Sequence, residues 1–162
     1  GASQILVIAH TEARRQLAQK LGATRVIDPD KENVTEIIKE MGSEGIDVVY
    51  ETSGAQQSFT LGLSILRARG EMVIISLPQK ELYFDAAKIL QKEIRIITSQ
   101  CSNDEFPVVV KLLAEDMLNV EGIITKKIHL EDLVQEGFDT LLKDKSQIKI
   151  LVTPKRENLR KE

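Results

Sequence analysis

The chain has 162 residues, of which 42% are hydrophobic and 29% charged, a balance typical of one ordinary globular domain. It has 22 Lys and Arg residues and 25 Asp and Glu residues. Neither positive nor negative charges form a long run, which argues against nucleic acid as a partner. No apolar stretch approaches the roughly 20 residues of a membrane helix and no secretion signal is visible, so we expect a cytoplasmic protein whose lone Cys101 forms no internal disulfide.

Short runs rich in Val and Ile alternate with segments of helical period over the first half of the chain. Strands are expected at 5–8, 25–27, 46–50 and 71–76, and helices at 12–21, 34–41 and 56–66, with a loop at 67–70. Thr11 is placed to cap the first helix and Gly22 to end it. This alternation predicts repeated strand–helix units and an α/β fold with a parallel sheet covered on both faces.

The pattern changes after Pro78. Short strands are expected at 82–84, 95–98, 123–125 and 148–152, and helices at 86–90, 107–115 and 130–142. We find no repeat or linker, so one domain is expected, although its last third need not belong to the core of the sheet. The charged tail at 154–162 is expected to fray.

In a parallel sheet of this kind, ligands bind beyond the carboxyl ends of the strands. The loops at those ends are short and carry small or hydroxyl residues, and they lie at 9–11, 28–30, 52–54 and 76–78. The same residue types are what strand-to-helix turns require without any ligand. The chain has neither a Gly-x-Gly-x-x-Gly turn nor a phosphate-binding Gly-Lys-Ser run, so composition alone leaves the ligand open.

Five segments, in the correct order, resemble the C-terminal part of medium-chain zinc-type alcohol and polyol dehydrogenases. They are the run at 9–28 with Leu-Gly-Ala and Val-Ile-Asp, Gly-Ile-Asp-Val-Val-Tyr-Glu-Thr-Ser-Gly at 45–54, and the segments at 66–74, 92–96 and 122–138. The resemblance implies a Rossmann-like doubly wound parallel sheet of order 3-2-1-4-5-6, whose first strand and Gly-rich turn are absent here. The strands at 5–8 and 48–50 would each lack a neighbour.

By this resemblance, residues 1–153 are a partial dinucleotide-binding domain whose C-terminal segment packs toward a catalytic domain outside the chain. The implied activity is hydride transfer between a nicotinamide cofactor and an alcohol, polyol or carbonyl substrate, with zinc held in that catalytic domain. The chain alone would be inactive, and we name no catalytic residue in it. A zinc-free quinone or enoyl reductase, and a non-catalytic nucleotide-binding or assembly module, are the alternatives.

The resemblance also implies which residues contact the cofactor and where subunits meet. The implied contacts are Ala9, His10, Thr11 and Arg14 at the adenosine ribose, Thr52, Ser53 and Gly54 on the adenine side, Ile75, Ser76 and Leu77 at the nicotinamide, and Ser99 and Gln100 on the other flank. Residues 82–84 and 95–98 match the region through which relatives dimerise, so a homodimer or tetramer is expected.

The cofactor preference depends on the end of the first strand. NAD-dependent relatives place an acidic residue there to bind the ribose hydroxyls, and this chain has Ala9. His10, Thr11, Arg14 and Arg15 follow, a pattern similar to that of NADP-dependent relatives, in which a guanidinium binds the 2′-phosphate. We therefore expect NADP, with NAD possible. The competing interpretation is that Arg14 and Arg15 form a solvated helix face.

Two other patterns are better explained without a metal. Asp28, Asp30 and Asn33 imitate the start of a calcium loop, but Lys39 replaces its closing carboxylate and the central Gly is absent. His129 has no neighbouring His or Cys in the sequence, so a surface role is expected.

Overall fold

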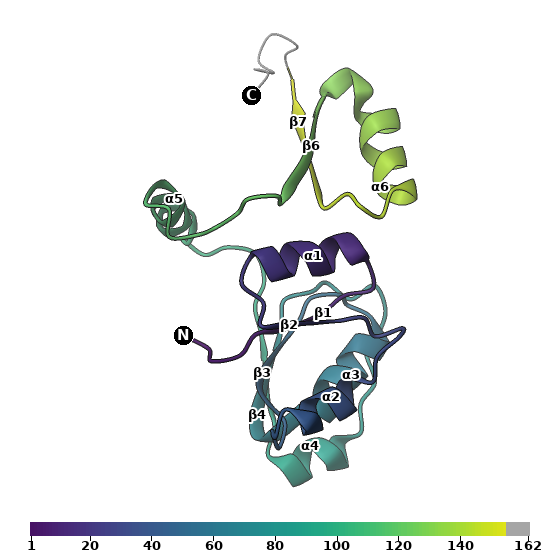
Figure 1. The fold of residues 1–162 in the computed structure, drawn as a ribbon, viewed down its shortest axis with the longest axis vertical. Helices are drawn as coiled ribbons and strands as arrows, with labels where there is room; N and C mark the ends of the chain where they lie inside the picture. Colours follow the sequence, from purple (N-terminus) through teal and green to yellow (C-terminus); the bar gives the residue numbers. More distant parts are fainter. Residues whose placement is uncertain (155–162) are drawn as a thin grey trace. The chain divides into compact units, whose positions relative to one another are not determined.

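The computed structural model describes residues 1–154, so the fraying expected of the tail from 155 onward lies outside the described residues. Contacts within the chain divide it into two compact units. Unit 1 combines residues 1–32 with the chain from Pro107 onward, and unit 2 is Asn33–Phe106. Figure 1 labels most of the helices and strands of both units.

The first strand–helix–strand unit of unit 1 follows the sequence pattern closely. It consists of β1 (Leu6–Ile8), α1 (Glu12–Lys20) and β2 (Arg25–Ile27). The two strands are parallel, with Leu6 opposite Arg25. Gly22 ends the helix turn at a φ of +102°, a conformation that favours glycine. Within residues 1–154, β1 pairs with β2 alone, so the strand lacks a second neighbour as predicted.

The C-terminal part of unit 1 forms a parallel pair of its own. After α5 (Phe106–Ala114) come β6 (Ile124–His129), α6 (Asp139–Lys143) and β7 (Lys149–Thr153). The helix expected over 130–142 is broken into a 3₁₀ turn at Leu130–Asp132, a π-helical turn at Leu133–Phe138 and the short α6. The last third therefore builds a sheet separate from β1–β2, as the sequence allowed.

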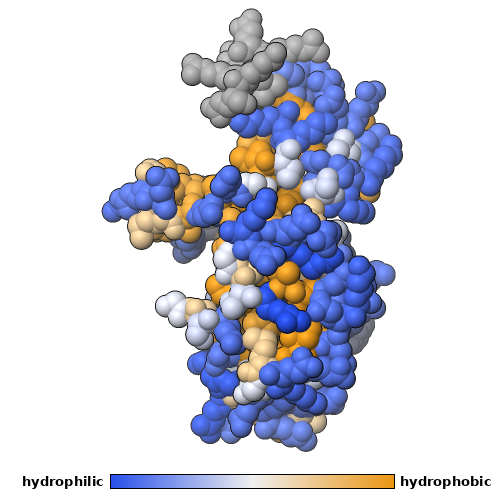
Figure 2. Space-filling view, viewed as in Figure 1, coloured by the Kyte–Doolittle hydropathy of each residue, from blue (hydrophilic) through white to orange (hydrophobic). Residues whose placement is uncertain are grey.

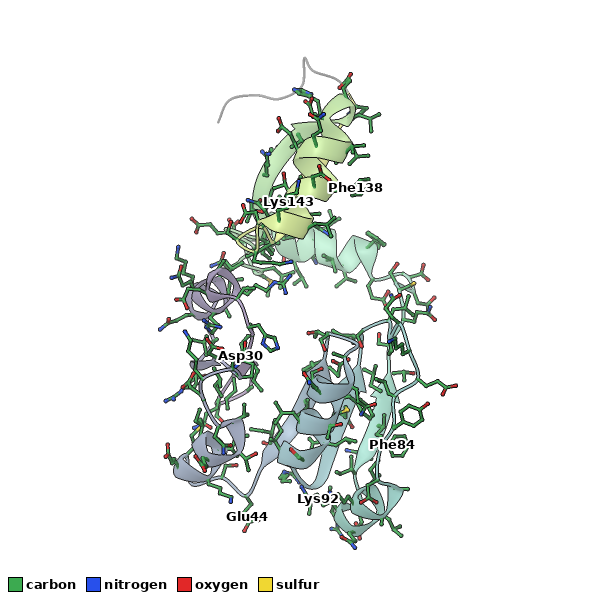
Figure 3. The ribbon with its side chains drawn as sticks, turned by 90° about the vertical axis from the view of Figure 1, so that its right-hand side faces the viewer. Asp30, Glu44, Phe84, Lys92, Phe138 and Lys143 are labelled. Atoms are coloured by element: carbon green, nitrogen blue, oxygen red, sulfur yellow. The ribbon has the colours of Figure 1, made fainter. Side chains whose placement is uncertain are left out.

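Unit 2 contains a three-stranded parallel sheet of order β3-β4-β5. Its elements are α2 (Val34–Glu40), β3 (Ile46–Glu51), α3 (Gln56–Ile65), β4 (Leu66–Ile74), α4 (Ala86–Lys92) and β5 (Arg95–Thr98). The core is formed by Phe59 of α3 together with Leu66 and Met72 of β4, all at most 2% exposed. Phe84, labelled in Figure 3, tilts its ring against that of Phe59 with centroids 6.2 Å apart.

Two expectations for unit 2 are wrong. The loop expected at 67–70 is a bulge within β4, because Ile46 pairs with Leu66 whereas Val48 already pairs with Glu71. The strand expected at 82–84 is not formed, because the backbone of Tyr83 bonds to the side chain of Gln56 instead of to another strand.

The strand orders match the doubly wound sheet that the sequence predicts. Unit 1 supplies the run β2-β1 and unit 2 the run β3-β4-β5, and in the described part of the chain β3 pairs with β4 alone. These are the runs expected on either side of a first strand in a 3-2-1-4-5-6 sheet. The fold is therefore Rossmann-like α/β, built of parallel strands and connecting helices.

The surface carries apolar residues beyond those in the two cores. Every residue of α5 is at least partly exposed, and Figure 2 shows apolar atoms gathered over this helix. Phe106 at its start is 70% exposed. None of the helices within residues 1–154 is long and apolar enough to cross a membrane.

Candidate functional site

The loop after β1 is held by a buried guanidinium. Arg15, only 8% exposed, donates from Nη1 to the backbone oxygens of Ala9 and His10, at 2.6 and 2.8 Å. Its Nη2 lies 2.8 Å from Oε2 of Glu12 and 2.9 Å from Oδ2 of Asp28. Arg15 therefore joins the loop after β1 to the loop after β2.

This burial corrects the interpretation of Arg14 and Arg15 as one solvated face of α1. Arg15 is directed inward, where Asp28 and two carbonyls use its donors. Arg14 is exposed, and no ion pair forms to it from any residue in the described range 1–154. Of the two guanidiniums, only that of Arg14 is free to meet a ligand.

His10 and Thr11 differ in their polar partners. The Nδ1 atom of His10 lies 2.8 Å from Oδ2 of Asp30, which Figure 3 labels on the loop after β2, and both side chains are exposed. Thr11 precedes the first residue of α1, but its side chain makes no capping hydrogen bond. The Oγ1 atom of Thr11 is buried and has no hydrogen-bond partner among residues 1–154. A polar ligand at this loop would satisfy it.

The side chains of Asp28 and Asn33 have partners within the protein. Asp28 is ion-paired with Arg15, and Asn33 caps α2 by accepting from the amides of Thr35 and Glu36 at 3.1 and 3.3 Å. Nowhere in residues 1–154 do three or more His, Cys, Asp or Glu side chains group as metal ligands do.

The loops after β3 and β4 meet at a buried carboxylate. Glu51, the last residue of β3, is 3% exposed. It accepts hydrogen bonds from the amide and hydroxyl of Ser53 at 3.0 and 2.7 Å, and from the amide of Gly54 at 3.1 Å. The hydroxyl of Ser58 on α3 donates to it at 2.5 Å, and the hydroxyl of Ser76 after β4 donates to its other oxygen.

These hydrogen bonds keep Glu51 ionised. Burial by itself raises the pKa of the carboxyl, because it removes water from the charge. The donors from Ser58, Ser76 and Ser53 outweigh burial and lower the pKa from 4.5 to about 2. A fixed negative charge therefore lies where two of the predicted cofactor-binding loops begin.

Gly54 brings the two loops of unit 2 within van der Waals contact. Its φ is +71°, and a Cβ atom there would lie 3.2 Å from Cα of Pro78 and 3.3 Å from the backbone oxygen of Leu77. Ile75 and Leu77 remain 49% and 76% exposed. A small residue at position 54 thus leaves a flat, partly apolar rim at the carboxyl ends of β3 and β4.

A hollow of about 680 Å³ opens beside this rim. It is lined by residues 54–56 at the start of α3 and by residues 79–83. Gln56 fixes its two sides, because its amide donates to the backbone oxygen of Tyr83 at 2.8 Å and accepts from the Tyr83 amide at 2.7 Å.

The structure brings some of the sequence-predicted contact residues together within each unit. In unit 1 the four residues Ala9, His10, Thr11 and Arg14 all lie at the carboxyl end of β1. In unit 2, Thr52, Ser53 and Gly54 follow β3 and meet Ser76 and Leu77 after β4. Ser99 and Gln100 follow β5 and are exposed, and the Ser99 amide donates to the Ile74 oxygen at 3.0 Å.

Sequence reasoning missed the buried charges Arg15, Asp28 and Glu51. The available signal was position: Asp28 and Glu51 each follow a run of strand-forming residues directly. A charge at the end of a buried strand needs partners, and the hydroxyls of Ser53 and Ser58 were visible nearby in the sequence, whereas Ser76 follows the next strand.

Comparison with known proteins identifies the family. The family model described as zinc-binding dehydrogenase matches residues 1–115. The chain is 36% identical over 155 residues to (R,R)-butanediol dehydrogenase of Bacillus subtilis, covering 95% of this chain and 44% of that protein. It is 32% identical over 156 residues to D-arabitol-phosphate dehydrogenase of Enterococcus avium, covering 94% of this chain and 44% of the relative. It therefore spans less than half the length of these relatives.

Solved structures agree with the sequence match. The crystal structure of 2R,3R-butanediol dehydrogenase from Bacillus subtilis has a TM-score of 0.86 at 35% identity, over 96% of this chain and 45% of that one. A zinc-binding dehydrogenase from Sinorhizobium meliloti, solved with NADP bound, has a TM-score of 0.84 at 25% identity, over 95% of this chain and 46% of that one. On its parallel strand order and these matches, the chain belongs to the zinc-binding dehydrogenase family.

Proposed function

We propose that this chain is the cofactor-binding portion of an oxidoreductase that transfers hydride between a nicotinamide dinucleotide and an alcohol, polyol or carbonyl substrate. The observation that carries the proposal is the position of the loops 9–11, 52–54 and 76–78. All three lie at the carboxyl ends of parallel strands in a chain of the zinc-binding dehydrogenase family.

Two features of the chain fit a bound dinucleotide. The buried Oγ1 of Thr11 lacks a partner in the described part of the chain, and a ribose hydroxyl or phosphate would complete its hydrogen bonding. Gly54 lets the loop after β3 lie close to the backbone of Leu77 and Pro78, so two of the proposed cofactor-binding loops are held together. When bound, the dinucleotide supplies the hydride acceptor or donor, and the residues of this chain orient it and exclude water from it.

We propose that NADP is the preferred cofactor. Ala9 offers no carboxylate at the end of β1, so nothing at that position repels a 2′-phosphate. Arg14 is exposed in the first turn of α1 and has no ion pair within residues 1–154, so its guanidinium is available to a phosphate. The relative from Sinorhizobium meliloti was solved with NADP bound, which supports the preference. NAD is the alternative.

The family description implies a zinc ion. The part of the chain described here, residues 1–154, holds no group of three potential ligands. We propose that the residues that hold zinc and activate the substrate lie outside residues 1–154. We also propose that the enzyme is a homodimer or tetramer, because β5 is bonded only to β4 among residues 1–154 and leaves an open sheet edge.

Calorimetric titration of the full-length protein with NADPH and NADH tests the proposal. NADPH should bind more tightly than NADH, and Arg14→Ala should weaken NADPH binding by roughly 10- to 100-fold with little effect on NADH, because a charge-assisted hydrogen bond is lost. Lys20→Ala, at the opposite end of α1, is the matched control and should leave both affinities unchanged.

The same titration separates the alternatives. Equal affinity for the two dinucleotides would contradict the NADP preference, and binding of neither would contradict the function itself. Turnover of a panel of polyols by the full-length protein distinguishes an oxidoreductase from a non-catalytic nucleotide-binding module.

A further inference from the structure

We propose that Glu51 is a positioning residue for the dinucleotide: its buried carboxylate fixes the loops after β3 and β4 in the arrangement that the cofactor requires. The inference rests on the proposed function and deepens it. Glu51 is 3% exposed, so its own surface is closed to a ligand and it can act only through the residues bonded to it.

The bonds of Glu51 come from both loops. From the loop after β3 it receives the Ser53 amide, the Ser53 hydroxyl and the Gly54 amide, the last at 3.1 Å from each carboxylate oxygen. From the loop after β4 it receives the Ser76 hydroxyl. Three residues that we expect to contact the cofactor are therefore fixed by one charge.

A carboxylate suits this role better than a neutral side chain. Ionised, it only accepts hydrogen bonds, and its two oxygens provide about four acceptor positions for the converging amides and hydroxyls. An amide at the same position would present an NH₂ group toward part of this donor set. Bonds to charged acceptors are also roughly twice as strong as neutral ones, so the loops lose stiffness when the charge is removed.

The bond to Glu51 also determines which kind of hydrogen bond Ser76 can form with a ligand. The hydroxyl of Ser76 has one hydrogen, and that hydrogen is donated to Glu51. Only the lone pairs of its oxygen remain, so Ser76 should accept hydrogen bonds from a ligand. Ribose hydroxyls and a carboxamide NH₂ are donors of the required kind.

The backbone pairing below the loops does not use the carboxylate. The backbone oxygen of Glu51 accepts from the amides of Ile75 and Ser76 at 3.0 and 3.2 Å, and these bonds do not involve the side chain. The apolar core at Phe59, Leu66 and Met72 is also untouched. Glu51→Gln should therefore fold while its loops lose their fixed arrangement.

The test compares cofactor binding and steady-state kinetics of the full-length protein with Glu51→Gln and Glu51→Asp. We expect Glu51→Gln to raise the Kd and KM for the dinucleotide by about 10-fold or more, because at least one charge-assisted hydrogen bond is lost. The kcat at saturation should change less than about threefold. Glu51→Asp retains the charge and should recover part of the lost affinity.

Phe59→Leu is the matched control for lost stability. Phe59 packs in the core of unit 2 and has no bond to Glu51, so its variant should lower Tm and leave the Kd unchanged. If Glu51→Gln lowers Tm in the same way while binding the dinucleotide like the wild type, the residue is only structural and the inference is overturned.

A second variant decides the matter if Glu51→Gln does not fold. Ser76→Ala keeps the charge and removes only the bond from the β4 loop, so it should raise the Kd by a smaller factor of about three to ten, as for one weaker bond. An unchanged Kd in Ser76→Ala would then overturn the inference. Failure of the wild-type protein to bind either dinucleotide is a different result, because it removes the proposed function itself.

Discussion

Arg15 illustrates how a charged side chain can be buried when its donors are matched by acceptors. Its two terminal nitrogens contact two backbone oxygens and two carboxylates. Asp28 opposite is 7% exposed and has a second cation, Lys31, at 3.6 Å. Breaking such a pair by removing one partner is costly, because the other charge stays buried without full compensation.

We predict that Arg15→Met destabilises the full-length protein by about 3–5 kcal/mol, the cost of leaving a buried charge without its partner. Arg14→Met, one residue earlier and exposed, should change stability by no more than about 0.5 kcal/mol. Adding Asp28→Asn to Arg15→Met should recover part of the loss. Urea unfolding curves measure all three variants, and equal losses in Arg14→Met and Arg15→Met would contradict the prediction.

For single residues, the sequence predicted which ones lie at the strand ends better than it predicted which contacts each one makes. The rule that ligands bind at strand ends selected Ser53, Gly54 and Ser76, and the structure joins these three at Glu51. Nothing in the sequence distinguishes Arg14 from Arg15, because they are identical neighbours on one helix. The difference is created by Asp28, thirteen positions beyond Arg15, and emerges only when β1 and β2 pair.

At the scale of elements, hydrophobic periodicity was sufficient for the regular segments. The helices α1, α2 and α3 and the strands β1, β2 and β3 lie within about one or two residues of their expected bounds, within the usual uncertainty of element ends. The two failures in unit 2, at 67–70 and 82–84, involve contacts between distant residues. The bulge follows the pairing of Ile46 with Leu66, and Tyr83 is held by Gln56.

The bulge explains why glycine is required at position 45. Gly45 has a φ of +141°, and a Cβ atom there would lie 2.5 Å from the backbone nitrogen of Arg67 and 2.9 Å from the backbone oxygen of Ile65. Backbone atoms cannot move aside as the end of a flexible side chain can. Any side chain at this position must therefore displace the start of β4.

We predict that Gly45→Ala lowers the free energy of unfolding by about 3 kcal/mol or more, which combines backbone strain with displacement of packed atoms. Gly22→Ala is the control, since Gly22 also has a positive φ, of +102°, but a Cβ atom there would have no neighbour within 4 Å. It should cost about 1–2 kcal/mol, from the backbone conformation alone. Thermal unfolding of both variants gives the comparison, and similar losses would show that the contact with Arg67 is unimportant.

At the scale of the whole molecule, each unit contains a carboxyl group with a strongly lowered pKa. In unit 2 this is Glu51, and in unit 1 it is Asp144. Hydrogen bonds from the side chains of Ser146 and Gln147 and from the Ser146 amide lower the pKa of Asp144 to about 2. Both groups bind a proton more readily in the unfolded chain, so both stabilise the fold at neutral pH.

We predict that the free energy of unfolding decreases as the pH is lowered from about 4.5 to about 2. A lowered folded-state pKa contributes stability that is complete above the unfolded value and disappears as the pH falls through the folded value. For Glu51, with its pKa moved from 4.5 to about 2, the contribution is on the order of 3 kcal/mol. The difference in free energy of unfolding between the wild type and Glu51→Gln should therefore become smaller as the pH is lowered through this range. A difference that stays constant from pH 5 to pH 2 would contradict the assignment.

The overall topology was accessible from the sequence because two independent signals agreed. The alternating strands and helices predicted a parallel α/β sheet, and the ordered family segments predicted which strands would lack a neighbour. Both are found in the pairing of β1 and β3. The separate β6–β7 pair carries a weaker signal, since its connecting helix is divided among a 3₁₀ turn, a π-helical turn and α6.

The residues that bond to Glu51 are not the side chains that line the rim beside the loops. Its partners are main-chain amides and serine hydroxyls, whereas the side chains of Thr52, Ile75 and Leu77 take no part in the bonding. These three positions can change identity without loosening the framework beneath them. Substitutions of these rim side chains can therefore change which ligand the rim prefers. The arrangement of the loops, fixed by Glu51, stays the same.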